Sequence, residues 1–184
     1  LFQLHQYNTQ HDKLLLLRQQ TQTQYYTTMT GGDCKGVCQI MCNGSVAGTL
    51  VLTQTSKGVS IKGSVSNLSG GAGKRGISVA TFGNLSNGPQ SCGPIFNPFD
   101  KTHGGPGDDL RMVGDLGNIV VDEAGNGEVD LQDSVISLVG PHSILGRSMI
   151  IHAGEDDQGR GGHENSLQTG NAGPRIAAGV IGLA

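Results

Sequence analysis

Alternating apolar and polar residues mark two half-buried β-strands in the middle of the chain. Val59, Ile61 and Val65 alternate with serine and lysine, and Val129 and Leu131 alternate with acidic and amide side chains. Successive side chains of a strand point to opposite faces, so this period of two predicts strands with one buried face. Five further short apolar runs predict more strands, over residues 49–52, 119–121, 135–138, 149–151 and 176–183.

The segments between these runs indicate how the strands connect. Most are short turns rich in glycine, asparagine and aspartate, such as residues 123–127, and no long apolar stripe of helical period is present. Many short strands joined in this way predict an all-β antiparallel sandwich or barrel. Residues 83–116 and 154–174 are too long for hairpin turns. Loops of that length often carry function, so we expect the site there.

The composition changes sharply near residue 30. All 31 glycines lie at or after Gly31, whereas the three tyrosines and a run of glutamines precede it. A Gln/Thr-rich segment buries too little apolar surface to offset its ordering entropy. We therefore predict a disordered tail over residues 1–30 and a folded domain over residues 31–184. Because residue 1 is leucine and Met29 offers an alternative start, it stays open whether residues 1–28 belong to the native protein.

Charge and cysteine content limit the classes of partner and the cellular compartment that we expect for this protein. The formal net charge is −3 with 12 Lys and Arg, which argues against nucleic acid as a partner. No apolar run reaches the roughly 18–20 residues of a membrane helix, so we expect no membrane association. Four cysteines without an identifiable pair, and no secretory signal, predict a reducing, cytoplasmic setting. Cys34, Cys38 and Cys42 share one face of an extended strand, and we interpret them as structural thiols rather than zinc or redox groups.

Several motifs together resemble the copper/zinc superoxide dismutase family. They read GPIFNP at 93–98, THGGP at 102–106, VGDLGN at 113–118, DSVISL at 133–138, and TGNAG followed by GVIG within 169–182. The resemblance covers about residues 35–184. It implies an eight-stranded antiparallel Greek-key β-barrel with two long loops. It also implies an enzyme that converts superoxide to oxygen and hydrogen peroxide at a copper ion accompanied by zinc.

The residues at the family's metal positions depart from its pattern. Four histidines hold copper in the family, because imidazole suits that ion. The matching residues here are Ser78, Ala80, Ile95 and His152, and those at the zinc positions are Ile95, His103, Met112 and Asp115. Alanine and isoleucine have no donor atom, and neutral serine and methionine are poor donors for these metals. We therefore expect no cofactor, with weak zinc or copper binding left open.

Other features implied by the resemblance are partly retained. Arg175 matches the arginine that draws superoxide toward copper, and Asp156 matches the carboxylate that links copper and zinc histidines. The family's disulfide positions are occupied by Pro89 and Ala178, so we expect no disulfide and an unpaired Cys92.

These residues lead to two hypotheses about function. The first is a non-catalytic family member, with no catalytic residues, that acts by protein binding or by regulating an active superoxide dismutase or its copper chaperone. The alternative is a metal-binding protein or dismutase with a rebuilt site around His152, His103 and Asp115, extended by His163 or Cys92.

The resemblance also implies an apolar dimer patch. A homodimer, or a mixed dimer with another superoxide dismutase family protein, would use the first strand together with Ile144, Leu145, Gly146, Val180, Ile181 and Leu183.

Overall fold

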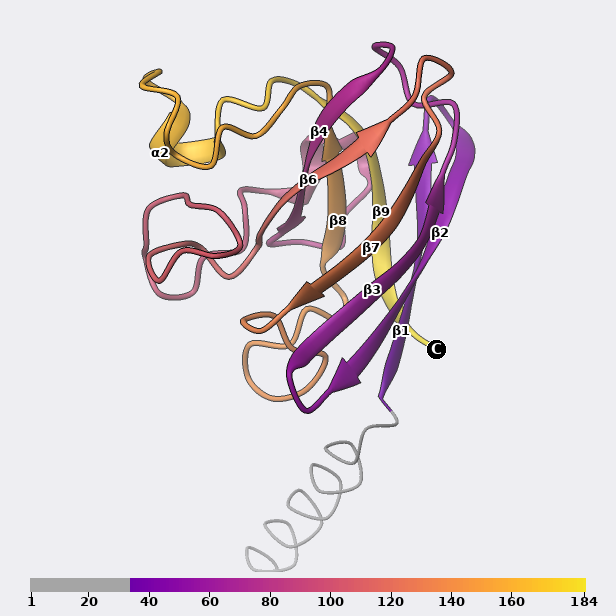
Figure 1. Ribbon diagram of the computed structural model, residues 1–184. Helices are drawn as coiled ribbons and strands as arrows, with labels where there is room; N and C mark the ends of the chain where they lie inside the picture. The colour runs from indigo at the N-terminus through magenta and orange to yellow at the C-terminus, as the bar shows by residue number, and fades with distance from the viewer. Residues whose placement is uncertain (1–33) are drawn as a thin grey trace, which may run out of the picture.

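A computed structural model describes residues 34–184 and contains a nearly closed antiparallel β-barrel (Figure 1). The predicted tail, residues 1–30, lies outside the described residues. The strands are β1 (Lys35–Cys42), β2 (Ser45–Thr55), β3 (Gly58–Val65), β4 (Gly73–Ala80), β5 (Ser86–Pro89), β6 (Asp115–Val121), β7 (Gly127–Asp133), β8 (Ser148–His152) and β9 (Arg175–Leu183). Two short helices accompany them, a 3-10 turn at Gln90–Cys92 and α2 at Ser166–Thr169.

Eight of the strands form one sheet, in the order β6-β4-β8-β9-β1-β2-β3-β7. Every neighbouring pair is antiparallel. The two edge strands, β6 and β7, follow one another in the sequence and contact each other, which brings the edges of the sheet together. The predicted all-β Greek-key barrel is therefore confirmed. No helix within residues 34–184 has the length and apolar character needed to cross a membrane.

Strand β1 shows how the alternating pattern builds the core. Its buried positions are Gly36, Cys38, Ile40 and Cys42, with more exposed residues between them. Cys34 is buried as well, so the three evenly spaced cysteines lie on the predicted common face. Burial raises the pKa of the Cys38 thiol to about 12. A thiol that stays neutral suits a position in an apolar core.

The apolar run at residues 135–138 does not form a strand, contrary to the sequence prediction. Strand β7 ends at Asp133, whose Oδ1 accepts the backbone N–H groups of Val135 at 2.8 Å and Ile136 at 2.9 Å. These bonds turn the chain away from the sheet. Ile136 and Leu138 are still buried and fill the core from this loop. The apolar pattern of residues 135–138 therefore predicted their burial correctly, but the strand predicted there was wrong.

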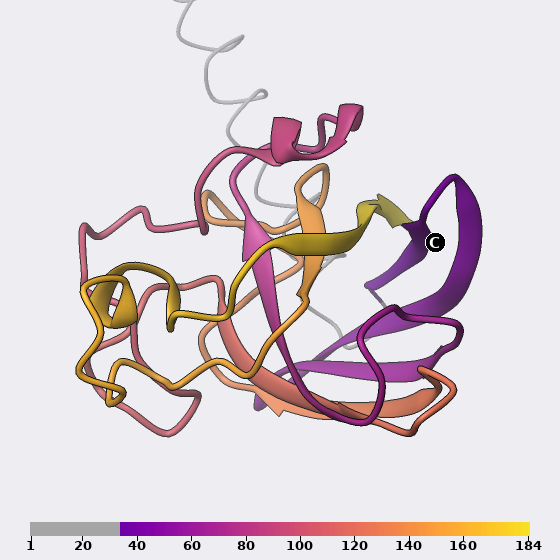
Figure 2. The same ribbon diagram turned by 90° about the horizontal axis from the view of Figure 1, so that it is seen from above.

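The two long loops, residues 81–114 and 153–174, lie side by side over one face of the barrel, outside β4, β8 and β9 (Figures 1 and 2). The N–H of His103 donates to the carbonyl of Leu167 at 2.9 Å, and Arg160 pairs with Asp108 at 2.5 Å. Because the loops cover its outer face, all five residues of β8 are buried. The prediction of two long loops is confirmed.

A buried ion pair fastens the first loop to the far edge of the sheet. Arg111 Nη2 lies 2.5 Å from Asp133 Oδ2, and both side chains are less than 5% exposed. Arg111 Nη1 also donates to the backbone carbonyl of Asp115, the first residue of β6. This arginine therefore connects β7, β6 and the first loop.

We expect Asp133→Asn to lower the free energy of unfolding by roughly 3–5 kcal/mol, because it leaves the buried Arg111 charge unpaired. Asp130→Asn is the matched control on the same strand. Asp130 pairs with Lys62, and their side chains are 71% and 65% exposed, respectively, so this ion pair contributes less than about 1 kcal/mol. Urea denaturation of both variants measures the difference. Equal losses would contradict the role given to Arg111.

Candidate functional site

The outer face of β4 and β8 brings the predicted copper positions together under the loops. Along β4 the side chains alternate, so Ile77 and Val79 enter the barrel core while Ser78 and Ala80 face outward. His152 ends β8, two strand positions beyond Ile150 on the same outer face. These positions share one face because the period of a strand is two.

Ile95 is fixed against this face by backbone pairing. It forms an isolated antiparallel bridge with Ala80, and the next residue, Phe96, donates its N–H to Val79 O at 2.8 Å. Ile95 is buried, with 5% of its surface exposed. A hydrocarbon side chain therefore lies where the sequence resemblance implies a ligand shared by two metals.

His103 is held between two buried carboxylates. Its Nε2 lies 2.7 Å from Asp156 Oδ1, and its Nδ1 lies 2.7 Å from Asp115 Oδ1. Burial lowers the pKa of this imidazole, but hydrogen bonding and charge attraction to the two carboxylates outweigh that effect and raise the pKa to about 9. At neutral pH the ring is therefore a positively charged imidazolium.

Both carboxylates are anchored by further hydrogen bonds. Asp115 Oδ2 accepts the N–H groups of Met112 at 2.8 Å and Gly104 at 3.0 Å. The backbone of Asp156 exchanges two hydrogen bonds with the side-chain amide of Asn118 on β6. These bonds, together with His103, join the first loop, the second loop and β6 into one buried cluster.

Gly170 closes this cluster from the second loop. A Cβ atom placed there would lie 1.8 Å from Asp156 Oδ1 and 2.5 Å from His103 Nε2, and the residue has φ of +62°. Only glycine combines this backbone conformation with so close an approach. Apart from the glycine itself, no pattern in the chain indicates this requirement.

A zinc ion does not fit the donors present. His103 Nδ1 and Asp115 Oδ1 lie 2.7 Å apart, so two candidate donor atoms do converge. A structural zinc site needs four donors, and the two remaining family positions hold Ile95 and Met112. Within residues 34–184 no group of three or more His, Cys, Asp or Glu side chains is arranged to hold a metal ion.

Copper fits no better. His152 is buried, and its Nδ1 lies 3.1 Å from Gly173 O. Because a carbonyl oxygen only accepts, Nδ1 carries the proton and Nε2 keeps the lone pair. Burial lowers the pKa of His152, so the ring is neutral and supplies one imidazole donor. Beside it on this face lie the buried Ser78 hydroxyl, which has no hydrogen-bond partner among the described residues, and Ala80.

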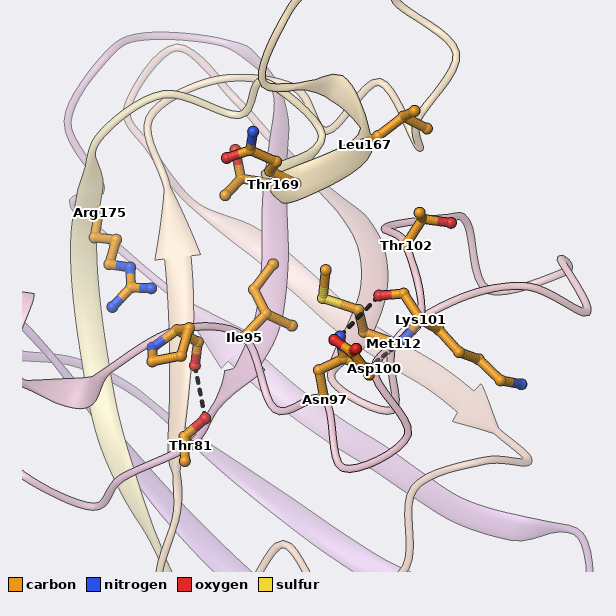
Figure 3. A pocket seen from close by; sticks show the side chains of 12 residues that line it. Thr81, Ile95, Asn97, Asp100, Lys101, Thr102, Met112, Leu167, Thr169 and Arg175 are labelled. Carbon is orange, nitrogen blue, oxygen red and sulfur yellow. Dashed lines mark hydrogen bonds between the residues drawn. The ribbon is translucent and has the colours of Figure 1, made fainter.

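Arg175 lines a cavity of about 580 Å³ between the two loops, together with Ile95 and Met112 (Figure 3). Its Nη1 donates to the carbonyl of Pro89 at 3.1 Å. The structure therefore brings Arg175 to the same cavity as the residues at two predicted metal positions.

Cys92 and His163 take no part in this cluster. Cys92 is a buried free thiol that donates to Asn84 O at 3.3 Å and packs beside Ala178 and Ile150. His163 is exposed, and its Nδ1 accepts the N–H of Asn165 at 3.1 Å. The structure gives neither residue a place in a rebuilt metal site.

The predicted dimer patch is only partly a surface. Ile144 and Ile181 are fully buried, so their side chains belong to the core and their assignment to the patch was wrong. Val180 and Leu183 are 37% and 59% exposed, and Leu145 is half-buried.

Phe82 joins this surface and was not foreseen. It is 55% exposed, and its neighbour Gly83 abuts Gly146 and Val180 so closely that an added Cβ would lie 2.1 Å from Gly146 O. Phe82 lies two residues after β4, outside the apolar runs that predicted strands. We call Phe82, Leu145, Val180 and Leu183 the β9 patch.

Comparison with known proteins gives consistent matches. The profile described as copper/zinc superoxide dismutase (SODC) matches residues 46–181. A protein of Cordyceps militaris named superoxide dismutase [Cu-Zn] is 49% identical over 156 residues, which cover 82% of this chain and 98% of the relative. Proteins of the same name from Cryptococcus neoformans var. grubii and Saccharomyces cerevisiae are 49% identical over 151 residues and 56% identical over 110 residues. They cover 81% and 60% of this chain, and 97% and 71% of the relatives.

The His103 cluster predicts a specific pH dependence of stability. Since the folded pKa of about 9 lies above the unfolded value of 6.5, the stabilisation is fully present below pH 6.5 and is lost as pH rises through 9. We expect the free energy of unfolding of the wild type to exceed that of His103→Gln by ~3 kcal/mol at pH 6 and by much less at pH 9.5. Urea denaturation with a chelator present measures this, with the exposed His163→Gln as control. A difference that stays constant with pH would contradict a charged His103.

Proposed function

The chain belongs to the copper/zinc superoxide dismutase family, and we propose that it is a non-catalytic member that acts by binding other proteins. In this proposal the barrel and the loop framework are retained while the metal chemistry is lost. The cytoplasmic setting expected from the cysteine content belongs to the same proposal.

The observation that carries this proposal is the donor set on the outer face of β4 and β8. Dismutation needs a metal that cycles between two oxidation states, and the protein contributes only its binding and tuning. Of the four positions that the family resemblance assigns to copper ligands, His152 alone offers an imidazole. Ser78, Ala80 and Ile95 supply a neutral hydroxyl and two hydrocarbons. One imidazole does not hold copper in a defined redox site.

The cluster around His103 supports the same conclusion for zinc. Both ring nitrogens already lie 2.7 Å from carboxylate oxygens. A metal at Nδ1 would have to replace the proton and separate His103 from Asp115 by the width of an ion. Met112 would then have to supply a further ligand, and its thioether is a poor zinc ligand.

Superoxide dismutation is the second candidate function, and the names of the relatives favour it. Proteins that are 49% identical over most of this chain are named superoxide dismutase [Cu-Zn]. In this alternative a site rebuilt around His152, His103 and Asp115 holds the metal. The convergence of His103 Nδ1 and Asp115 Oδ1 is the structural feature that favours it.

The two candidates are separated by measuring metal content and superoxide dismutation on the same purified full chain, after loading with copper and zinc and desalting. We expect metal far below one equivalent and no rate above that of the desalted buffer. Stoichiometric copper with a copper-dependent rate would contradict the proposal and establish the dismutase alternative.

A restored variant provides the matched control. Replacing Ser78→His, Ala80→His, Ile95→His and Met112→His together supplies the full set of histidines that the family resemblance implies. We expect this variant to retain copper and zinc after desalting and to gain a measurable rate, because the framework that positions the ligands is present. If wild type and the restored variant had the same metal content and rate, the residues at these four positions would not explain a loss of metal binding and activity.

The β9 patch is the surface we propose for protein binding. Phe82, Val180 and Leu183 expose large apolar side chains around the end of β9. Exposed apolar patches of this kind mark protein interfaces. The partner in this proposal is a second copy of the chain, or an active superoxide dismutase subunit or its copper chaperone.

We expect Val180→Glu to convert a dimer into a monomer in sedimentation equilibrium, because it places a charge at the centre of an apolar interface. Val120→Glu is the control, since Val120 is 64% exposed on β6, away from the patch. The same pair of variants, co-purified with an active superoxide dismutase, tests the mixed dimer. A wild-type chain that is monomeric and captures neither partner would contradict the patch assignment.

A further inference from the structure

Three Asn-Gly pairs occur in the chain, and the fold holds them differently. Asn43-Gly44 forms the turn between β1 and β2, Asn87-Gly88 lies in β5, and Asn126-Gly127 leads into β7. A glycine that follows an asparagine leaves its backbone nitrogen unshielded by a side chain and free to rotate toward the asparagine amide. By sequence, all three pairs are therefore candidates for deamidation, and the structure separates them.

Asn43-Gly44 is the pair that the fold leaves unrestrained. It forms a two-residue turn, because Cys42 and Ser45 on either side of it are paired across the hairpin. Asn43 is exposed, and within residues 34–184 neither its side-chain amide nor the N–H of Gly44 has a hydrogen-bond partner. A Cβ atom added at Gly44 would meet no atom within 4 Å. An exposed turn without such contacts opens locally at low cost.

The Asn87-Gly88 pair is restrained through its backbone. The N–H of Gly88 donates to Leu85 O at 3.0 Å, and the N–H of Asn87 donates to Ser91 Oγ at 2.8 Å. The nitrogen that would react at this pair is therefore already engaged, and its hydrogen bond has to break before the nitrogen can turn toward the asparagine side chain.

The Asn126-Gly127 pair is restrained through the asparagine side chain. Asn126 Nδ2 donates to Asp122 Oδ2 at 3.3 Å, and its backbone N–H donates to Asp122 Oδ1 at 2.8 Å. Gly127 begins β7 and is paired with Val65 of β3. Both partners of the reaction are thus fixed in place at this turn.

We propose that Asn43 is a site of spontaneous deamidation in the folded protein. The nitrogen of Gly44 loses its proton to solvent base and attacks Cγ of Asn43, which forms an N–Cγ bond. The Cγ–Nδ2 bond breaks, and ammonia leaves with a proton from solvent, so that a succinimide ring remains. Water then opens the ring at Cγ or at the backbone carbonyl carbon, which yields aspartate or isoaspartate, respectively. The net reaction consumes one water and releases one ammonia.

The two products act differently on the β1–β2 turn. Asn43 has φ of +50° and Gly44 has φ of +77°, as a tight hairpin turn of two residues requires. Aspartate tolerates this conformation, so that product keeps the turn and changes the formal net charge from −3 to −4. Isoaspartate adds a carbon atom to the backbone, which a two-residue turn does not accommodate. The second product therefore weakens the pairing of β1 with β2.

The test is peptide mapping by mass spectrometry of the full chain during incubation at pH 8, with a parallel sample unfolded in urea. In urea the three pairs lose their structural differences, and we expect them to react at similar rates. In the folded chain we expect Asn43 to react at least roughly fivefold faster than Asn87 or Asn126, since one hydrogen bond that has to break first is worth about that factor.

Two variants locate the reaction. Asn43→Gln lengthens the side chain, so that the slower closure of a six-membered ring would be needed, and we expect it to remove most of the isoaspartate formed in the folded chain. Asn87→Gln is the matched control at an exposed asparagine of another pair and is expected to leave the isoaspartate content unchanged. Labelling with an isoaspartyl methyltransferase measures this content.

The effect on the turn is measured on the modified protein itself. Ion exchange separates the acidic products, and urea denaturation compares them with Asn43→Asp, which carries the new charge without the extra backbone atom. We expect the isoaspartate fraction to unfold at a lower urea concentration than Asn43→Asp. Equal midpoints would overturn the effect assigned to the turn.

Other outcomes decide the site itself. Equal rates at the three pairs in the folded chain, or a slower rate at Asn43, would overturn the inference. An Asn43 that reacts in urea and stays unmodified in the folded chain would overturn it as well. The reaction depends on neither the metal content nor the dismutation rate of the chain, so each of these results leaves the proposed function standing.

Discussion

A buried imidazolium held between two carboxylates is the interaction on which the outer half of this molecule depends. His103 comes from the first loop, Asp156 from the second, and Asp115 begins β6, so the three charges join segments that are far apart in the sequence. Neither carboxylate nor imidazolium would be tolerated alone in such a buried place, because an unpaired charge there is costly. Gly170 permits the close approach, and the bond from His103 N–H to Leu167 continues the connection. These contacts fix the loops over β4 and β8.

This arrangement determines what the covered face can do. Strand alternation places Ser78, Ala80 and His152 on one outer face, and the Ile95 bridge brings a fourth side chain to it. The framework is that of a family whose relatives are named for copper and zinc. At the four positions expected to hold copper ligands, however, two side chains are hydrocarbon and one is a neutral hydroxyl. Fold is set by the core and the backbone pairing, whereas metal chemistry is set by a handful of side chains. A family can therefore retain the first and lose the second. Under the proposed function, this face serves binding rather than redox chemistry.

The sequence allowed much of this to be predicted, and its failures have physical causes. Alternation predicted β3 and β7 because their inner faces are apolar, and the cysteine spacing predicted the inner face of β1. Residues 135–138 were misassigned because an apolar run reports burial, while the Asp133 carboxylate that turns the chain acts through backbone bonds. Ile144 and Ile181 were wrongly placed on a surface. The resemblance indicates which segments lie near the interface, but not which of their side chains are exposed. The double contact of His103 was out of reach, since it requires three segments to meet in space.

Amide hydrogen exchange on the full chain tests the central claim most directly, by comparing the loops before and after removal of metal with a chelator. The N–H groups of His103, Gly104 and Met112 report on the cluster, since they donate to Leu167 O and Asp115 Oδ2. If protein contacts alone hold the loops, their protection is the same in chelator, in zinc and in copper. Protection that collapses on chelation and returns with metal would contradict the account, because it would show that a bound ion carries the stability of the loops.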